Sequence, residues 1–141
     1  MKTLLLTTLF FLITSIAVAD YTIRSAYKFE NIDMIKNSDG SNIMNTTATG
    51  INAYSTGDTV IIKCLVNLKN SILTGSCQGS DKDGDIEYTT VERDISKGNK
   101  GIMRRIGGTG KYENRSSACE YVVELTDFSV GVGYLTANCK E

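Results

Sequence analysis

Hydrophobic and polar residues alternate along much of the chain after residue 20. In segment 21–30, YTIRSAYKFE, every second residue from Tyr21 to Phe29 falls on one side, and the charged Arg24, Lys28 and Glu30 fall on the other. A period of two residues with aromatic and β-branched side chains on one side is typical of a half-buried β-strand. This segment therefore predicts a strand that turns its aromatic side toward a core.

Seven more stretches have the composition of strands. They are 43–55 (with Gly50 inside it, which predicts a bend or bulge), 58–68, 71–79, 86–94, 102–106, 116–125 and 131–140. The polar segment 31–42 and the glycine-rich segment 107–110 are expected to be connections. No stretch has a helical period. Eight strands at this spacing predict an all-β fold, either an eight-stranded antiparallel barrel or a β-sandwich. We favour the barrel, because closure removes exposed sheet edges.

The first nineteen residues have the layout of a secretory signal peptide. Lys2 precedes a long apolar run, and Ala17-Val18-Ala19 forms a small-residue cleavage site before Asp20. We therefore expect residues 1–19 to be a signal peptide and residues 20–141 to be one exported domain, in the periplasm or outside the cell. No later stretch is apolar enough for a transmembrane helix, so we expect no membrane span.

The four cysteines all lie in the exported part, where an even count indicates two disulfides with three possible connectivities. The midpoint between Cys64 and Cys77 falls between Asn70 and Ser71, at a predicted turn. The midpoint between Cys119 and Cys139 falls at Ser129, in another predicted turn. Each pair would then face across a hairpin, which favours Cys64–Cys77 and Cys119–Cys139.

The composition argues against several kinds of function. The chain has no histidine, which removes Ser-His-Asp and Cys-His catalysis and histidine-ligated metals. After cleavage 14 basic and 16 acidic residues remain, so nothing favours a nucleic acid as partner. Any catalysis would have to use carboxylates, Tyr, Lys, Arg or backbone groups, and we expect no catalytic residue and no cofactor.

The stretch DKDGDIEYTTVE, residues 81–92, resembles a calcium loop at first sight. Asp81, Asp83 and Asp85 fall at positions one, three and five of a twelve-residue frame. The glycine required at position six is replaced by Ile86, and the flanking segments are strands rather than helices. We therefore expect a hairpin tip with Gly84 at the bend, and the three aspartates remain only weak candidates for a metal site.

The stretch GGTGKY, residues 107–112, differs from a phosphate-binding loop. Arg105 stands where the first glycine of that motif belongs, and Tyr112 stands where Ser or Thr should hold magnesium. We expect Gly107, Gly108 and Gly110 to form a tight turn at a barrel corner instead.

Two further groups of residues are candidates for binding. Arg104 and Arg105, with Lys100 and Lys111, could form a basic spot for an anion, although a solvated strand end is the simpler interpretation. Five aromatic residues could line a ligand cavity or simply fill a core. They are Tyr21, Tyr27, Phe29, Tyr88 and Tyr121.

The succession of a cysteine, DKDGD and, about twenty residues later, GGTGKY resembles small exported bacterial proteins of the allene oxide cyclase/dirigent-like barrel type. The resemblance covers roughly residues 60–140 and implies an eight-stranded antiparallel barrel. The sequence departs from that pattern after GGTGKY, where ENRSSACEY is polar and lacks a further glycine. The resemblance carries no catalytic or substrate-binding residue onto this chain.

Three functions are consistent with these observations. The first is non-enzymatic binding of a small apolar or amphipathic ligand inside the barrel, since eight strands enclose room for one small ligand. The second is a cyclase- or dirigent-like barrel enzyme, which needs an ionisable group inside. The third is a structural or interaction protein of the cell envelope. The sequence names neither the ligand nor the oligomeric state.

Overall fold

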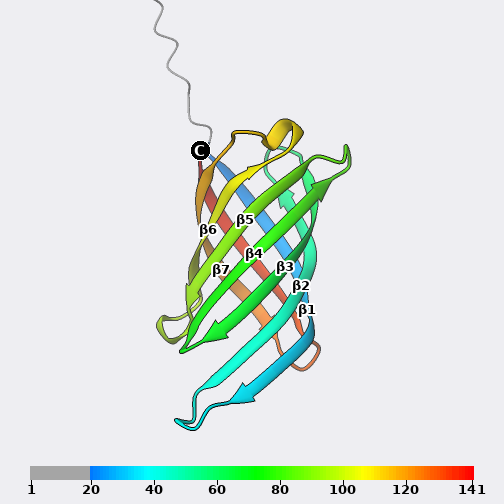
Figure 1. The fold of residues 1–141 in the computed structure, drawn as a ribbon. Helices are drawn as coiled ribbons and strands as arrows, with labels where there is room; N and C mark the ends of the chain where they lie inside the picture. The colour runs from blue at the N-terminus through cyan, green and yellow to red at the C-terminus, as the bar shows by residue number, and fades with distance from the viewer. Residues whose placement is uncertain (1–19) are drawn as a thin grey trace, which may run out of the picture.

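The structure is a computed structural model that describes residues 20–141, and the predicted signal peptide lies outside the described residues. Over the described range the chain forms eight strands that close into an antiparallel barrel (Figure 1). The strands are β1 (Tyr21–Lys36), β2 (Asn42–Tyr54), β3 (Thr59–Lys69), β4 (Ile72–Asp81), β5 (Ile86–Asp94), β6 (Lys100–Gly108), β7 (Ser117–Asp127) and β8 (Val132–Lys140). Each strand pairs with the next, and β8 pairs with β1. This confirms the predicted barrel and excludes the sandwich.

Two short 3₁₀ turns interrupt this pattern, η1 (Ile95–Lys97) and η2 (Gly110–Tyr112). No helix in residues 20–141 is long and apolar enough to span a membrane.

Residues 31–36 of the polar segment 31–42 are a strand and not a connection, and only residues 37–41 connect β1 to β2. β1 continues to Lys36 through an irregularity between Glu30 and Asp33, where Asn31 has a φ of 52°. The β1–β2 hairpin consequently extends beyond one end of the barrel (Figure 1). Ile32, Met34 and Ile35 are all exposed on this extension. With no buried face, the segment has no two-residue hydrophobic period, which is why sequence pattern alone misses it.

The glycine segment 107–110 was also predicted wrongly as a single tight turn. β6 runs through Gly107 and Gly108, and the turn follows as η2. The pairing with β5 shifts register between Tyr88 and Thr89, opposite Gly107, whose φ of 131° suits glycine alone. Glycines with positive φ occur both in β-bulges and in tight turns, so the sequence does not distinguish the bulge at Gly107 from a turn.

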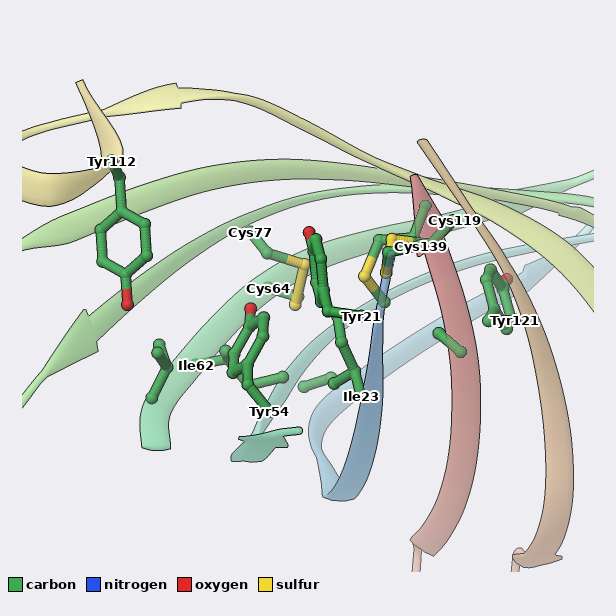
Figure 2. Packing of buried hydrophobic residues seen from close by; sticks show 14 of the residues in the cluster. Tyr21, Ile23, Tyr54, Ile62, Cys64, Cys77, Tyr112, Cys119, Tyr121 and Cys139 are labelled. Atoms are coloured by element: carbon green, nitrogen blue, oxygen red, sulfur yellow. A yellow bond between two sulfur atoms is a disulfide. The ribbon is translucent and has the colours of Figure 1, made fainter. Parts of the chain in front are cut away.

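The barrel interior is filled by every second residue of each strand. In β1 Tyr21, Ile23 and Ser25 are buried while Thr22 and Arg24 are exposed. β3 repeats this pattern with Val60, Ile62, Cys64 and Val66. Figure 2 shows that tyrosine, isoleucine and disulfide side chains from opposite walls meet inside the barrel. The alternation seen in the sequence is thus the inside–outside alternation of a closed sheet.

The two disulfides join adjacent strands inside the barrel. Cys64 is bonded to Cys77 across β3 and β4, and Cys119 to Cys139 across β7 and β8. The members of each pair lie directly opposite in the strand register, as the hairpin midpoints indicated. Asn70 and Ser71 form the β3–β4 turn, both with positive φ, as a two-residue hairpin turn of type I′ requires.

Candidate ligand cavity in the barrel

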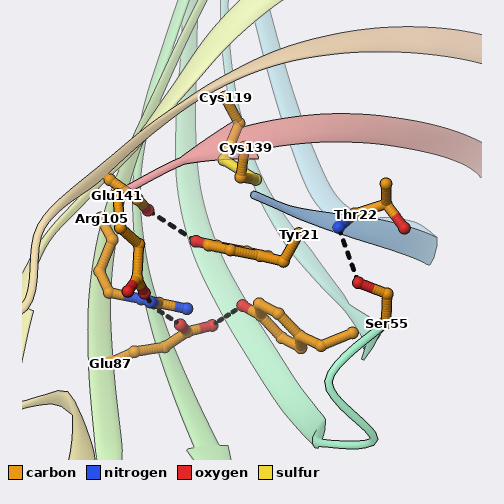
Figure 3. The surroundings of a disulfide bond; sticks show 10 residues. Tyr21, Thr22, Ser55, Glu87, Arg105, Cys119, Cys139 and Glu141 are labelled. Carbon is orange, nitrogen blue, oxygen red and sulfur yellow. Dashed lines mark hydrogen bonds and ion pairs between the residues drawn. A yellow bond between two sulfur atoms is a disulfide. The ribbon is translucent and has the colours of Figure 1, made fainter. Parts of the chain in front are cut away.

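The interior of the barrel has two unlike halves. The half that contains the C-terminus is a packed polar cluster (Figure 3), and the half toward the β1–β2 hairpin encloses a cavity. The two halves meet at Thr89 and Met103, which contact both.

The polar cluster is centred on a buried ion pair. Glu87 on β5 is 1% exposed and Arg105 on β6 is 5% exposed, and Arg105 Nε donates a hydrogen bond to Glu87 Oε2 at 3.1 Å. The hydroxyl of Tyr54 donates a short hydrogen bond to Glu87 Oε1. Both carboxylate oxygens therefore have donors, which is the condition under which a buried charge is tolerated.

Aromatic rings and the chain terminus complete the environment of Arg105. The guanidinium carbon lies 5.3 Å from the ring centre of Tyr21, 5.7 Å from Tyr54 and 5.2 Å from Tyr112. These are cation–π distances. Arg105 Nη1 also donates to Glu141 Oε1 at 3.1 Å, and that carboxylate is bound by Arg115 as well. The last residue of the chain thereby closes this end of the barrel.

The polar cluster stabilises this end of the barrel and leaves no space for a ligand. Burial raises the pKa of Tyr21, whose hydroxyl lies 2.6 Å from Ser117 Oγ. Burial, together with the charge of Glu87, also raises the pKa of Tyr54. The space among these side chains does not admit even a water molecule. Glu87 and Arg105 are thus neutralised by each other and closed off from any ligand.

The other half encloses a cavity of about 80 Å³ with mostly apolar walls. Its lining includes Ile62, Val66 and the disulfide between Cys64 and Cys77. Toward the hairpin end the lining becomes half-buried rather than buried, through residues that pack on the core from its rim: Phe29, Leu73, Val91, Val123 and Leu135. Mostly apolar walls with a few polar groups are typical of small-molecule sites, and the volume here, well below the roughly 300–1,000 Å³ of most such sites, restricts it to a very small ligand.

Two tyrosines form walls of the cavity because glycines face them. A side chain at Gly133 on β8 would collide with the ring of Tyr27, and one at Gly101 on β6 would collide with the ring of Tyr121. Each ring therefore lies over the backbone of a neighbouring strand. Tyr27 also packs edge-on against Phe29, with ring centres 5.3 Å apart. Burial raises the pKa of Tyr121 to about 12.

Two polar side chains on the cavity lining lack partners within the described residues. Asn52 on β2 is 3% exposed, and its Oδ1 accepts no hydrogen bond. Arg93 on β5 has a buried Nε that donates none. Buried polar atoms in native proteins nearly always have partners, so such atoms on a cavity wall are positioned for a ligand or water.

The aspartates of the DKDGD stretch lie outside the barrel, in the β4–β5 hairpin. Asp81 Oδ1 accepts from the backbone nitrogens of Asp83 and Asp85 at 2.8 and 3.0 Å, and Gly84 makes the bend with a φ of 85°. Ile86 begins β5. Within residues 20–141 no three acidic or cysteine side chains gather where they could hold a metal ion.

A lysine from GGTGKY forms ion pairs with Asp81 of this hairpin and with Asp58. Lys111 Nζ lies 2.8 Å from Asp81 Oδ2 and 2.6 Å from Asp58 Oδ1. The backbone nitrogen of Lys111 donates to Asp85 Oδ2 at 3.1 Å, and the Asp85 carboxylate leaves no room for a side chain at Gly110. The two motifs singled out in the sequence are therefore one interlocked structure at a barrel corner.

The remaining candidates are dispersed. Arg104 faces outward and Arg105 inward, Lys100 pairs with Glu120, and Lys111 pairs as described, so no basic spot forms. Of the five aromatic candidates, Tyr27, Phe29 and Tyr121 line the cavity. Tyr21 belongs to the polar cluster, and Tyr88 is 41% exposed on the outer face.

Sequence reasoning missed Asn52, Glu87 and Arg93 inside the barrel, and it placed Arg105 in a basic spot with Arg104 instead of inside. A signal existed, because each falls on the inward side of the strand alternation. A polar residue at an inward position of a strand marks either an ion pair or a site.

Comparison with known proteins supports the fold. The structure resembles the pterocarpan synthase dirigent protein GePTS1 with a TM-score of 0.56 and 11% identity, covering 86% of this chain and 87% of that one. It resembles the pterocarpan synthase dirigent protein PsPTS1 with the same TM-score and 10% identity, covering 85% and 93%. No protein-family model and no curated protein matches the sequence. At sequence identities this low, the structural similarity shows a shared barrel fold and nothing further.

Proposed function

We propose that this protein is an exported barrel that binds a small amphipathic molecule in its interior cavity without transforming it. The observation that carries the proposal is Asn52, an amide that is 3% exposed and unpartnered on the wall of an otherwise largely apolar cavity. Leaving such a group unpaired costs about 1–3 kcal/mol. A ligand that satisfies it would recover that free energy and also bury apolar surface.

The second candidate, a cyclase- or dirigent-like enzyme, is favoured by the fold and by the presence of Arg93 in the cavity. Against it, the residues that line the cavity include no carboxylate, and Glu87 is held by Arg105 and Tyr54 in the other half. The titratable side chains on the lining are Tyr27, Tyr121 and Arg93, and burial raises the pKa of Tyr121 to about 12, whereas general acid–base catalysis favours a pKa near the working pH. Binding without chemistry therefore fits this cavity better.

A cavity-filling variant tests the binding proposal. Ala48 on β2 lines the cavity, whereas Ala53 on the same strand is exposed. The probe is 4-methylphenol, followed by NMR chemical shifts of the backbone amides. The wild type and Ala53→Leu should bind it with shifts grouped around the cavity, and Ala48→Leu should not. No binding to the wild type, or equal binding to Ala48→Leu, would refute the proposal.

The third candidate, an envelope interaction protein, rests on the β1–β2 hairpin extension. Its residues Ile32, Met34 and Ile35 are between 52% and 63% exposed, and Phe128 in the β7–β8 turn is 80% exposed. Exposed apolar groups of this kind often mark interaction sites. Sedimentation of the wild type against Ile32→Asn/Ile35→Asn distinguishes this role: self-association that the double variant abolishes would support it, and a monomer in both cases would argue against it.

We also infer that the chain is exported after cleavage before Asp20, as a relative of the small exported bacterial barrels that DKDGD and GGTGKY suggest. The two disulfides support an oxidising compartment. Expression of the full chain in a bacterial host, with N-terminal sequencing of the periplasmic fraction, should give a mature protein that begins at Asp20. An uncleaved cytoplasmic product would contradict the inference.

A further inference from the structure

We propose that the cavity is specific for a compact organic carboxylate, whose anionic group pairs with Arg93 at the rim while a hydroxyl or N–H at its far end donates to Asn52. This rests on the proposed function and adds the chemical class of the ligand. Neither residue belongs to the motifs that the sequence singled out.

The first argument is that Arg93 lacks the counter-ion that comparable cations of the chain possess. Arg105 has Glu87 and Glu141, and Lys111 has Asp58 and Asp81. Within residues 20–141 no carboxylate lies within ion-pair distance of Arg93. Its buried Nε is also without an acceptor.

The neighbours of Arg93 on its own strand do not supply that acceptor. Asp94 turns to the β5–β6 connection, where it accepts from Ser96 and pairs with Lys97. Glu92 lies on the opposite face of β5 and lines an outer groove instead of the cavity. The planar guanidinium therefore faces a cavity that offers no anion, and a carboxylate matches its paired N–H donors.

The second argument is the position of Asn52. Oδ1 is an acceptor, so the complementary ligand atom carries a hydrogen. Arg93 is paired in register with Leu73, at the half-buried rim, whereas Asn52 lies two residues from Tyr54 and the polar cluster. The two groups thus stand at different depths, and a ligand that satisfies both has an anion at one end and a donor at the other.

The third argument is the shape and chemistry of the space between them. The walls there are aliphatic and aromatic, with Tyr27 on β1 and Tyr121 on β7, the two strands that flank β8. The cavity volume of about 80 Å³ is below the ~150 Å³ of a closed cavity known to take benzene, but this cavity is open at its rim. The ligand body is accordingly no larger than a single ring, of which only the inner part lies inside the cavity while the outer part and the carboxylate stand in the open rim. A long acyl chain does not fit inside.

Three related probes test the assignment by calorimetry and amide NMR: 4-hydroxybenzoate, the neutral 4-hydroxybenzyl alcohol, and benzoate, which lacks the donor. The wild type should bind 4-hydroxybenzoate at least tenfold more tightly than either of the others, because each of these omits one polar contact. Equal affinity for 4-hydroxybenzoate and 4-hydroxybenzyl alcohol would overturn the assignment while leaving cavity binding intact. Failure of all three, with 4-methylphenol also unbound, would overturn the proposed function as well.

Variants assign the effect to the residues. Arg93→Gln should weaken binding of 4-hydroxybenzoate by about 10- to 100-fold, as loss of a charged hydrogen bond does, and leave 4-hydroxybenzyl alcohol unchanged. Arg93→Lys should keep part of the preference for the anion. Arg104→Gln, which removes the same charge from the outer face of β6, is the matched control and should bind like the wild type. An equal loss in Arg93→Gln and Arg104→Gln would refute a specific contact.

Chemical shifts of the wild-type protein alone can also test the assignment, and this test does not depend on whether a variant folds. In the wild type, the amide shifts that 4-hydroxybenzoate causes and 4-hydroxybenzyl alcohol does not should centre on β5 around Arg93. Those that benzoate fails to cause should centre on β2 around Asn52. Differences spread over the outer face would contradict the assignment.

Discussion

Lys111 Nζ lies 2.8 Å from Asp81 Oδ2, so this lysine neutralises the first aspartate of the DKDGD stretch. The ammonium also contacts Asp58, so it joins three segments of the chain at one corner of the barrel. The carboxylates that looked like metal ligands are thus partners of an internal cation and of backbone nitrogens.

Removal of this lysine should therefore expose the aspartates to solvent cations. Lys111→Met is expected to lower the melting temperature by several degrees, and added calcium should restore part of the loss. Lys82→Met is the matched control, since Lys82 pairs only with exposed Asp83 in the same hairpin and should change neither quantity. A calcium-dependent rise in the melting temperature of the wild type would contradict this account.

The same contact predicts a window of pH in which the corner is stable. Lys111 holds the pKa of Asp81 and Asp58 below their usual 3.8, and the two carboxylates raise the pKa of Lys111 above 10.5. The acidic contributions are present above about pH 4 and are lost as the pH falls through the lowered pKa values. The contribution of Lys111 is fully present below its unfolded pKa of about 10.5 and is lost as the pH rises through its raised folded pKa. The stability difference between wild type and Lys111→Met should thus be largest at neutral pH and shrink at both extremes, as measured by urea unfolding. A difference independent of pH would count against it.

Removing one member of the buried Glu87–Arg105 pair should reduce the free energy of unfolding more than replacing both members with apolar residues. Glu87→Leu or Arg105→Met leaves one buried charge without its partner, so each should reduce the free energy of unfolding by about 3–5 kcal/mol. The double variant Glu87→Leu/Arg105→Met should lose less than the two single losses combined. Arg104→Met on the outer face should be nearly neutral. Additive losses in the double variant would show that the residues act independently.

The two disulfides should stabilise the barrel to a similar extent. Sequence separations of 13 and 20 residues predict about 3 kcal/mol for each, because loop entropy varies slowly with length. Cys64→Ala/Cys77→Ala and Cys119→Ala/Cys139→Ala should therefore show comparable shifts in chemical denaturation. A large loss from one pair and none from the other would indicate strain or unfolded-state structure instead.

The buried tyrosines should resist ionisation until the barrel opens. Burial raises the pKa of Tyr21, Tyr54, Tyr112 and Tyr121, the last two to about 12. Their contribution to stability is present below the ordinary pKa of 10 and is lost as the pH rises through the raised values. Phenolate absorbance should accordingly rise in two stages, the second coinciding with loss of the β-sheet signal in circular dichroism. A single stage near pH 10 with the sheet intact would refute this.

Local pattern was a good guide wherever one face of a strand is buried. The alternation in 21–30 placed Tyr21, Ile23 and Ser25 inside, and the register implied by the turn at Asn70 placed Cys64 opposite Cys77. It failed at Ile32 to Ile35, where a strand has no buried face, and at Gly107, where a bulge resembles a turn. Periodicity reports burial rather than strand pairing, so these errors have one cause.

The sequence by itself determined the eight strands, their inward faces, the pairing of the cysteines across hairpins and the absence of histidine chemistry. Those features depend on residues near one another in the chain or on composition. Only the tertiary structure decided that Lys111 neutralises Asp81, that Glu87 and Arg105 close one end, and that Asn52 and Arg93 face an unfilled cavity at the other. These relationships arise when the sheet closes, because closure brings the inward side chains of opposite strands into one small space.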